Sequence, residues 1–293
     1  MDASAAGTAT QTCYRHPNRV TGVSCSSCGR PICPDCMTPT PVGMRCPECA
    51  SQRTKVHNMR TMRSDPRVTV GIIIVCAVAF LASGSIGFSG SANSRLLNDF
   101  ALNGPAVDNG EYWRLVTGGF LHVNLLHIGF NMYLLWILGQ MLEPLYGSAR
   151  FAAVYFTALL WGSFGALLVT PHANTVGASG AVFGLMGAAA VEVRARQIPL
   201  MQSGIGGLLL INLIISFTLP GISWGGHIGG LIGGAACAAV LRYGDVHRNR
   251  ALALAGAAAI GVAALVGSIA TAHSSKAEGL GGAGPATLVS PEQ

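Results

Sequence analysis

The chain has 293 residues, of which 51% are hydrophobic and only 10% are charged. Soluble domains carry about 25% charged residues, so this composition excludes an ordinary soluble globular protein and predicts an all-α, polytopic membrane protein. The formal net charge is +6, but nine of the 18 Lys and Arg residues precede residue 68, and the others lie mainly between apolar segments. This distribution is typical of membrane topology and disfavours binding to nucleic acid.

The N-terminal region contains a cysteine-rich module. Residues 1–12 are small and polar, and we expect them to be disordered. Residues 13–49 hold seven of the nine cysteines, and their candidate metal ligands form four pairs, each with two residues between its members: Cys13 and His16, Cys25 and Cys28, Cys33 and Cys36, Cys46 and Cys49. Eight ligands make two four-coordinate zinc sites, and a fold this small needs the metal because it cannot build a sufficient core.

Seven apolar segments follow a basic linker at 50–67, which either satisfies the positive-inside rule or binds anionic lipid. We expect membrane helices at about 68–88, 121–142, 151–170, 178–193, 200–219, 225–241 and 251–272. The fourth and sixth are short for a hydrocarbon core of ~30 Å. The Gly/Ser/Pro-rich tail at 273–293 is predicted to be disordered.

Charge sets the expected orientation of these helices. The first 20 residues lack the apolar core of a cleavable signal peptide. Connections on the side of the N-terminus carry six arginines, whereas those on the other side carry Arg95 and Arg114. The positive-inside rule therefore predicts a plasma-membrane protein with a cytoplasmic N-terminus and an extracytoplasmic C-terminus.

Two polar residues lie inside this apolar region at matching depths. Ser179 precedes Arg194 by fifteen residues, and His227 likewise precedes Arg242 by fifteen. At 1.5 Å per residue, each lies roughly 22 Å above the inner boundary, or about 8 Å below the outer surface. Polar residues in hydrocarbon are costly and are candidates for function. The equal depth predicts a hydrogen bond in which His227 is the base for a Ser179 nucleophile.

Neighbouring residues support this pair. Gly180 and Gly184 on one helix, and Gly226, Gly230 and Gly234 on the other, present small faces that allow close approach in a membrane. No acidic residue lies at the same depth, which favours a Ser–His dyad whose imidazole is oriented by packing. Phe183, one helical turn after Ser179, offers an aromatic face for that purpose. The polar connection at 171–178 should dip below the outer surface and border a water-filled cavity.

The second apolar segment adds three polar side chains, His122, His127 and Asn131. His127 and Asn131 are four residues apart and share a helical face. Asn131 lies ~18 Å above the inner boundary, and its amide is a candidate donor to an oxyanion. For His122 we favour a structural hydrogen bond between helices, while for His127 the structural and catalytic roles both remain open.

Five motifs in order carry a resemblance to a known family: Glu111-x-Trp113-Arg114, His122-x4-His127-x3-Asn131, Glu143-x3-Gly147, Gly177-x-Ser179-Gly180 and Gly226-His227-x-Gly229-Gly230. Over residues 68–242 the chain resembles the rhomboid intramembrane serine proteases. The resemblance implies a six-helix core in which Ser179 attacks and His227 is the general base. It also implies an oxyanion site made by His127, Asn131 and the Ser179 amide.

The same resemblance implies cleavage of transmembrane substrates near the outer membrane face, without a metal or cofactor in the reaction. It places Trp113 and Arg114 in an outer loop that sits partly in the leaflet. The sequence departs from the family in two ways. Phe183 stands where many members carry tyrosine, and the seventh segment at 251–272 is additional to the six-helix core.

The N-terminal module resembles B-box-type zinc fingers. By that analogy the first and third ligand pairs share one zinc ion and the second and fourth share the other, although sequential pairing remains open. We favour a cytoplasmic protein partner for this module. Two alternatives to a protease also remain: an inactive rhomboid-like protein that binds membrane clients, and a transporter or channel. The intact Ser179 and His227 argue against the first, and the scarcity of intramembrane charge argues against the second.

Overall fold

A computed structural model describes residues 11–51, 66–84 and 95–281. The chain divides into two compact units, residues 1–63 and 64–293, which are described separately below. The expectations for residues 1–10, for most of the basic linker, for 85–88 of the first apolar segment and for the tail beyond 281 fall outside the described residues.

The N-terminal unit is built from two short hairpins and one turn of helix. Strand β1 (Gln11–Thr12) pairs with β2 (Val20–Thr21), and β3 (Thr38–Thr40) pairs with β4 (Gly43–Arg45), both antiparallel. A 3-10 helix, η1 (Pro34–Cys36), and helix α1 (Pro47–Ser51) complete it. Its core consists of Ile32 and six buried cysteines. The prediction of disorder over 1–12 is wrong for Gln11 and Thr12, because backbone pairing with β2 orders them.

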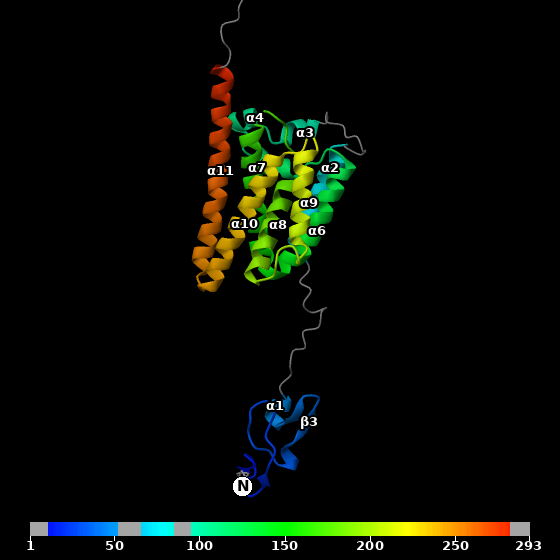
Figure 1. Ribbon diagram of the computed structural model, residues 1–293, viewed down its shortest axis with the longest axis vertical. Helices are drawn as coiled ribbons and strands as arrows, with labels where there is room; N and C mark the ends of the chain where they lie inside the picture. The colour runs from blue at the N-terminus through cyan, green and yellow to red at the C-terminus, as the bar shows by residue number, and fades with distance from the viewer. Residues whose placement is uncertain (1–10, 52–65, 85–94, 282–293) are drawn as a thin grey trace, which may run out of the picture. The chain divides into compact units, whose positions relative to one another are not determined.

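The second unit is a bundle of helices (Figure 1). A helix occupies each of the seven predicted segments: α2 (Arg67–Ala82), α6 (Leu125–Tyr146), α7 (Ser148–Val169), α8 (Ser179–Ala195), α9 (Ile205–Thr218), α10 (Trp224–Val246) and α11 (Arg250–Gly281). By length and composition α6, α7, α10 and α11 are long and apolar enough to span a membrane, and α2 and α9 are shorter apolar helices. The chain is therefore a multi-pass membrane protein.

Two predicted boundaries are wrong. The sixth segment is not short, because α10 has 23 residues and continues past the apolar run to Val246. Near its end Asp245 accepts two 2.8 Å hydrogen bonds from Arg150 at the start of α7, which stabilises the polar extension. The tail is not disordered from 273, because α11 continues to Gly281. His273 on this extension pairs with Asp108 of the connection between α2 and α6.

Glycine contacts hold α7, α8 and α10 together. A Cβ added to Gly184 of α8 would lie 2.7 Å from the carbonyl oxygen of Gly230 on α10. On α7, Gly162 packs against Gly180 and Gly226, so a Cβ there would lie 3.2 Å from Gly180 Cα and from the Gly226 carbonyl oxygen. The predicted α8–α10 glycine contact is thus present, and α7 joins it. Direct backbone contact brings the α8 and α10 axes close enough for short side chains to meet.

From Arg95 on, the described part of the connection between α2 and α6 forms four short elements: α3 (Arg95–Phe100), α4 (Gly104–Asp108), α5 (Arg114–Thr117) and η2 (Gly118–Phe120). Arg114 is its internal anchor. Its guanidinium donates to the Glu111 carboxylate at 2.7 Å and to the backbone carbonyls of Asn98 and Ala101 at 2.7 and 2.9 Å. In Figure 1 α3 and α4 lie at the end of the bundle opposite the α10–α11 connection.

Candidate active site

The connection that leads to Ser179 is held by its backbone. Leu102 and Thr175 exchange two hydrogen bonds of 3.0 and 2.8 Å, and Gly177 N–H donates to the Gly118 carbonyl at 2.9 Å. The polar loop at 171–178 is therefore hydrogen-bonded through its backbone to the α2–α6 connection, which is the kind of support that the predicted position below the membrane surface would require. Gly177 has φ +122°, a conformation that favours glycine, immediately before the turn into α8.

Ser179 begins α8, and His227 lies in the first turn of α10. The Ser179 Oγ and His227 Nε2 atoms are 2.8 Å apart, so the contact that the equal depths predict is present. The imidazole is 8% exposed and stacks on the Phe183 ring, with centroids 4.2 Å apart and planes inclined by 15°. The aromatic face expected from Phe183 is therefore present as well.

A second serine, which the sequence did not single out, lies on the other side of the imidazole. Ser216 Oγ of α9 is 2.6 Å from His227 Nδ1, and its side chain is 3% exposed. Depth counting does not select this residue, because no charge marks the inner end of α9 and the helix also carries Asn212 and Thr218. Serines in membrane helices are also common without any role beyond bonding to their own backbone.

Both proposed oxyanion donors lie on α6, and His127 is close to the start of α8. The space that a Cβ at Gly177 would fill is 2.6 Å from His127 Nε2 and 3.8 Å from Ser179 Oγ, so the imidazole faces the backbone beside the nucleophile. Asn131 is 4% exposed, and its Nδ2 donates to the His127 carbonyl at 2.9 Å. Its Oδ1 has no hydrogen-bond partner in the described part of the chain. The oxyanion roles of both residues stay predictions.

The remaining site residues have structural positions. His122 is fully buried, accepts a 3.5 Å hydrogen bond from the Ala178 N–H through Nε2, and packs edge-on against His127 at 5.0 Å. It therefore positions the residue next to Ser179. Gly180 leaves room for Gly162 and Gly226, since a Cβ there would lie 3.2 Å from each. Trp113 is 51% exposed at the start of α5, whereas the adjacent Arg114 is buried.

Comparison with known proteins identifies the family. Residues 109–244 match the rhomboid domain, and this range contains the Ser179–His227 pair. The chain belongs to the rhomboid family.

Individual relatives match parts of the chain. Rhomboid protease GluP of Bacillus subtilis is 38% identical over 156 residues, which cover 52% of this chain and 31% of the relative. Rhomboid-like protease 3 of Toxoplasma gondii is 31% identical over 57% of this chain and 66% of its own length. Inactive RHOMBOID-like protein 8 of Arabidopsis thaliana is 33% identical over 43% of this chain and 37% of its own length. The chain thus spans between about a third and two thirds of the length of these relatives, and the family includes both proteases and inactive proteins.

The seventh helix of this rhomboid, α11, begins beyond the matched range and packs on α7 and α10. Trp161 Nε1 of α7 donates to the Ile260 carbonyl of α11 at 3.0 Å. Near the far end, Ala272 joins an apolar cluster with residues of the α2–α6 connection and α7. The additional helix is therefore an integral part of the bundle.

The N-terminal module, residues 13–49, lies entirely outside the matched range. Its candidate metal ligands form two clusters. Cys13, His16, Cys33 and Cys36 make one, and Cys25, Cys28, Cys46 and Cys49 make the other, with all ligand atoms in each within 4.8 Å of one another. This is the crossed pairing of first with third and second with fourth, not the sequential one. Tetrahedral zinc with Zn–S bonds of ~2.3 Å separates its sulfurs by about 3.8 Å. The Cys28 and Cys46 sulfurs are 3.8 Å apart.

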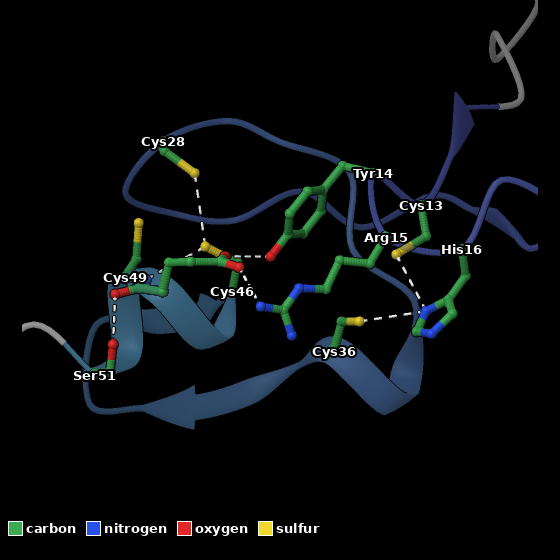
Figure 2. Close-up of polar contacts among 10 residues, drawn as sticks. Cys13, Tyr14, Arg15, His16, Cys28, Cys36, Cys46, Cys49 and Ser51 are labelled. Atoms are coloured by element: carbon green, nitrogen blue, oxygen red, sulfur yellow. Dashed lines mark hydrogen bonds and ion pairs between the residues drawn. The ribbon is translucent and has the colours of Figure 1, made fainter.

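Hydrogen bonds in the module fit this metal chemistry. The Cys46 amide donates to Cys25 Sγ at 3.3 Å and lowers the pKa of that thiol to about 6. The Cys49 amide likewise lowers the pKa of the Cys46 thiol, but burial and neighbouring side chains outweigh it and raise the pKa of Cys46 to about 12. A bound divalent cation would deprotonate such a thiol. Figure 2 shows Tyr14 and Arg15 reaching toward α1, where both donate to the Glu48 carboxylate and join the two clusters.

Proposed function

We propose that this rhomboid is a serine endopeptidase that cleaves transmembrane proteins within the bilayer. The observation that carries the proposal is the 2.8 Å contact between Ser179 Oγ and His227 Nε2, with the imidazole stacked on Phe183. A serine becomes nucleophilic when an adjacent base takes its proton. A hydrogen-bonded and oriented base is the arrangement that this chemistry requires.

The residues have the following roles in the proposed reaction. His227 Nε2 takes the Ser179 proton while Oγ attacks the substrate carbonyl carbon. The Ser179 amide, with His127 and Asn131, donates to the carbonyl oxygen as it becomes negatively charged. His227 then gives its proton to the leaving amine as the peptide bond breaks. A water molecule, deprotonated by His227, hydrolyses the acyl-enzyme and restores the Ser179 hydroxyl.

The expected substrates are transmembrane segments cut near the outer membrane face. The depth of about 8 Å below the outer surface supports this location, as does the arginine distribution, which supports a cytoplasmic N-terminus. We also propose the plasma membrane as the site of action, although one relative is named as mitochondrial. The zinc module would then face a cytoplasmic protein partner.

An inactive client-binding protein is the second candidate, because a relative of similar identity is named inactive. The two candidates differ in whether Ser179 reacts. The test uses the full chain in liposomes with a model transmembrane substrate, together with a fluorophosphonate that labels activated serines. Wild type should cleave and be labelled, whereas Ser179→Ala and His227→Ala should do neither.

Ser268→Ala is the matched control for this test. Ser268 is also buried, and its hydroxyl bonds at 2.8 Å to the Ala264 carbonyl of its own helix, α11. This variant should keep wild-type activity. Cleavage that persists in Ser179→Ala would refute the proposed nucleophile, and a wild type that neither cuts nor is labelled would favour the inactive candidate.

A further inference from the structure

The hydrogen bonds of Ser216 determine where the imidazole carries its proton. Ser216 Oγ has two close neighbours, the Asn212 carbonyl oxygen at 2.6 Å and His227 Nδ1 at 2.6 Å. A backbone carbonyl only accepts, so both contacts can be hydrogen bonds only when the single hydroxyl hydrogen of Ser216 goes to Asn212. The lone pairs of Oγ then face Nδ1, and that contact is a hydrogen bond only if Nδ1 carries the hydrogen.

This assignment has a consequence for Nε2. A neutral imidazole has one N–H, and when it lies on Nδ1 the other nitrogen is an acceptor. Nε2 is the nitrogen that faces Ser179 Oγ. The opposite tautomer would direct an N–H at the serine and leave no base to take its proton.

We propose that Ser216 is a positioning residue that holds His227 in the Nδ1-protonated tautomer and stabilises the imidazolium formed during attack. The inference rests on the proposed protease function. In the resulting relay Ser179 donates to Nε2, Nδ1 donates to Ser216, and Ser216 donates to the Asn212 carbonyl. Ser216 touches no reacting atom, and it acts through His227.

The packing of α9 supports this role. The residues on either side of Ser216 are exposed on the helix surface, Ile215 at 39% and Phe217 at 61%, whereas Ser216 is buried against α10. Thr218 makes the same type of bond to its own helix, at 2.8 Å to the Ile214 carbonyl, but it is exposed. A hydroxyl that only bonds to its own backbone does not require burial against an imidazole.

The other groups around His227 leave the Nδ1 side to Ser216. From α8 the imidazole meets Ser179 at Nε2 and the Phe183 ring on its face. From α6 the titratable neighbour is His127, which lies beside Gly177 on the Ser179 side. Ser216 therefore supplies the hydrogen bond that the acidic member of a catalytic triad provides elsewhere, with a neutral hydroxyl in place of a carboxylate.

The kinetic test compares wild type, Ser216→Ala, Ser216→Thr and the Ser268→Ala control, all as full-length protein in liposomes. Ser216→Ala should lower kcat about tenfold, equivalent to about 1.4 kcal/mol in the barrier, and leave KM unchanged, because substrate binding does not involve Nδ1. Ser216→Thr keeps the hydroxyl and should restore most of the rate. Ser268→Ala should match wild type. An unchanged kcat in Ser216→Ala, or an equal loss in Ser216→Ala and Ser216→Thr, would overturn the inference.

A spectroscopic test of the wild-type protein depends neither on activity nor on how the Ser216 variants fold. In protein labelled with 15N-histidine, the His227 resonances, assigned from their absence in His227→Ala, should show a directly bonded proton on Nδ1 and none on Nε2. A proton on Nε2 in the neutral wild type would refute the inference even if the enzyme is active. A wild type with the expected tautomer that fails to cleave any substrate would instead refute the proposed function.

Discussion

Replacing Gly230 with alanine should separate α8 from α10 and disable the active site. A Cβ at Gly230 would overlap the Gly180 carbonyl group and lie 2.6 Å from its carbon, whereas ordinary contact begins at 3.4 Å. The obstructing atoms are backbone, so they cannot rotate away. Relieving the contact with the carbonyl carbon alone requires about 0.8 Å of separation, and the Gly180 carbonyl oxygen lies closer still, so the helices must move apart by more than about 0.8 Å. If the Ser179 and His227 side chains separate by the same amount, their 2.8 Å hydrogen bond would lengthen to more than about 3.6 Å, beyond hydrogen-bonding range.

The expected cost of Gly230→Ala is about 1–3 kcal/mol of stability from overpacking. The cleavage rate should fall by about 100-fold, the usual penalty for a misplacement near 1 Å. The assays are thermal unfolding and cleavage of a transmembrane substrate in liposomes. Gly207→Ala on α9 is the control, because a Cβ there meets no atom within 4 Å, and it should leave the rate unchanged. A Gly230→Ala enzyme that cuts at the wild-type rate would refute the idea that glycine contacts set the Ser–His distance.

Three further predictions concern other parts of the chain. Glu143→Gln should lower the stability by about 1–3 kcal/mol in thermal unfolding. The Glu143 carboxylate accepts hydrogen bonds from Val68 N–H, Thr69 N–H, the Thr69 hydroxyl and the Ser148 hydroxyl, whereas the amide nitrogen of glutamine cannot accept. A variant with wild-type stability would contradict this. His273→Ala should lower the stability by about 1–3 kcal/mol in thermal unfolding, because the Asp108 side chain that His273 contacts is only 4% exposed and would lose one of its partners; wild-type stability would contradict this. Elemental analysis should find about two zinc ions per chain, and about one in Cys25→Ser or Cys13→Ser. Removing the metal with a chelator should make residues 11–51 sensitive to protease without stopping substrate cleavage by the membrane domain. Freshly purified protein that contains no zinc would exclude the metal sites.

The positions of the membrane helices were predictable because apolar length is a direct physical requirement for crossing a bilayer. The ends of α10 and α11 were not, since those ends extend into polar sequence through tertiary contacts. The bond from Arg150 to Asp245 and the His273–Asp108 pair join residues that are far apart in the sequence. No local sequence pattern indicates such long-range contacts, yet they extend the helices into segments whose polar composition alone predicts that the helix has ended.

The Ser179–His227 pair was predictable from two charges that mark the same membrane boundary on neighbouring helices. Ser216 lacked such a marker, and a serine in an apolar helix has too many structural uses to be selected. Similarly, the glycine faces of α8 and α10 were recognised as surfaces for close approach, but the partner role of Gly162 on α7 was not, because glycine spacing alone does not say which helix approaches. In the N-terminal module the four candidate ligand pairs have equal spacing, so their crossed arrangement depends on the fold and was indicated only by analogy.

The loop before Ser179 is fastened to the α2–α6 connection through backbone groups, with Leu102 bonded to Thr175, Gly104 to Pro171 and Gly118 to Gly177. Such bonds depend on main-chain geometry, and most positions supply the same N–H and C=O groups whatever side chain they carry. Surface residues of this connection can therefore vary without displacing the nucleophile. Under the proposed function, the exposed side chains of this connection are free to adapt to different substrates, while its backbone attachment to the loop before Ser179 stays the same.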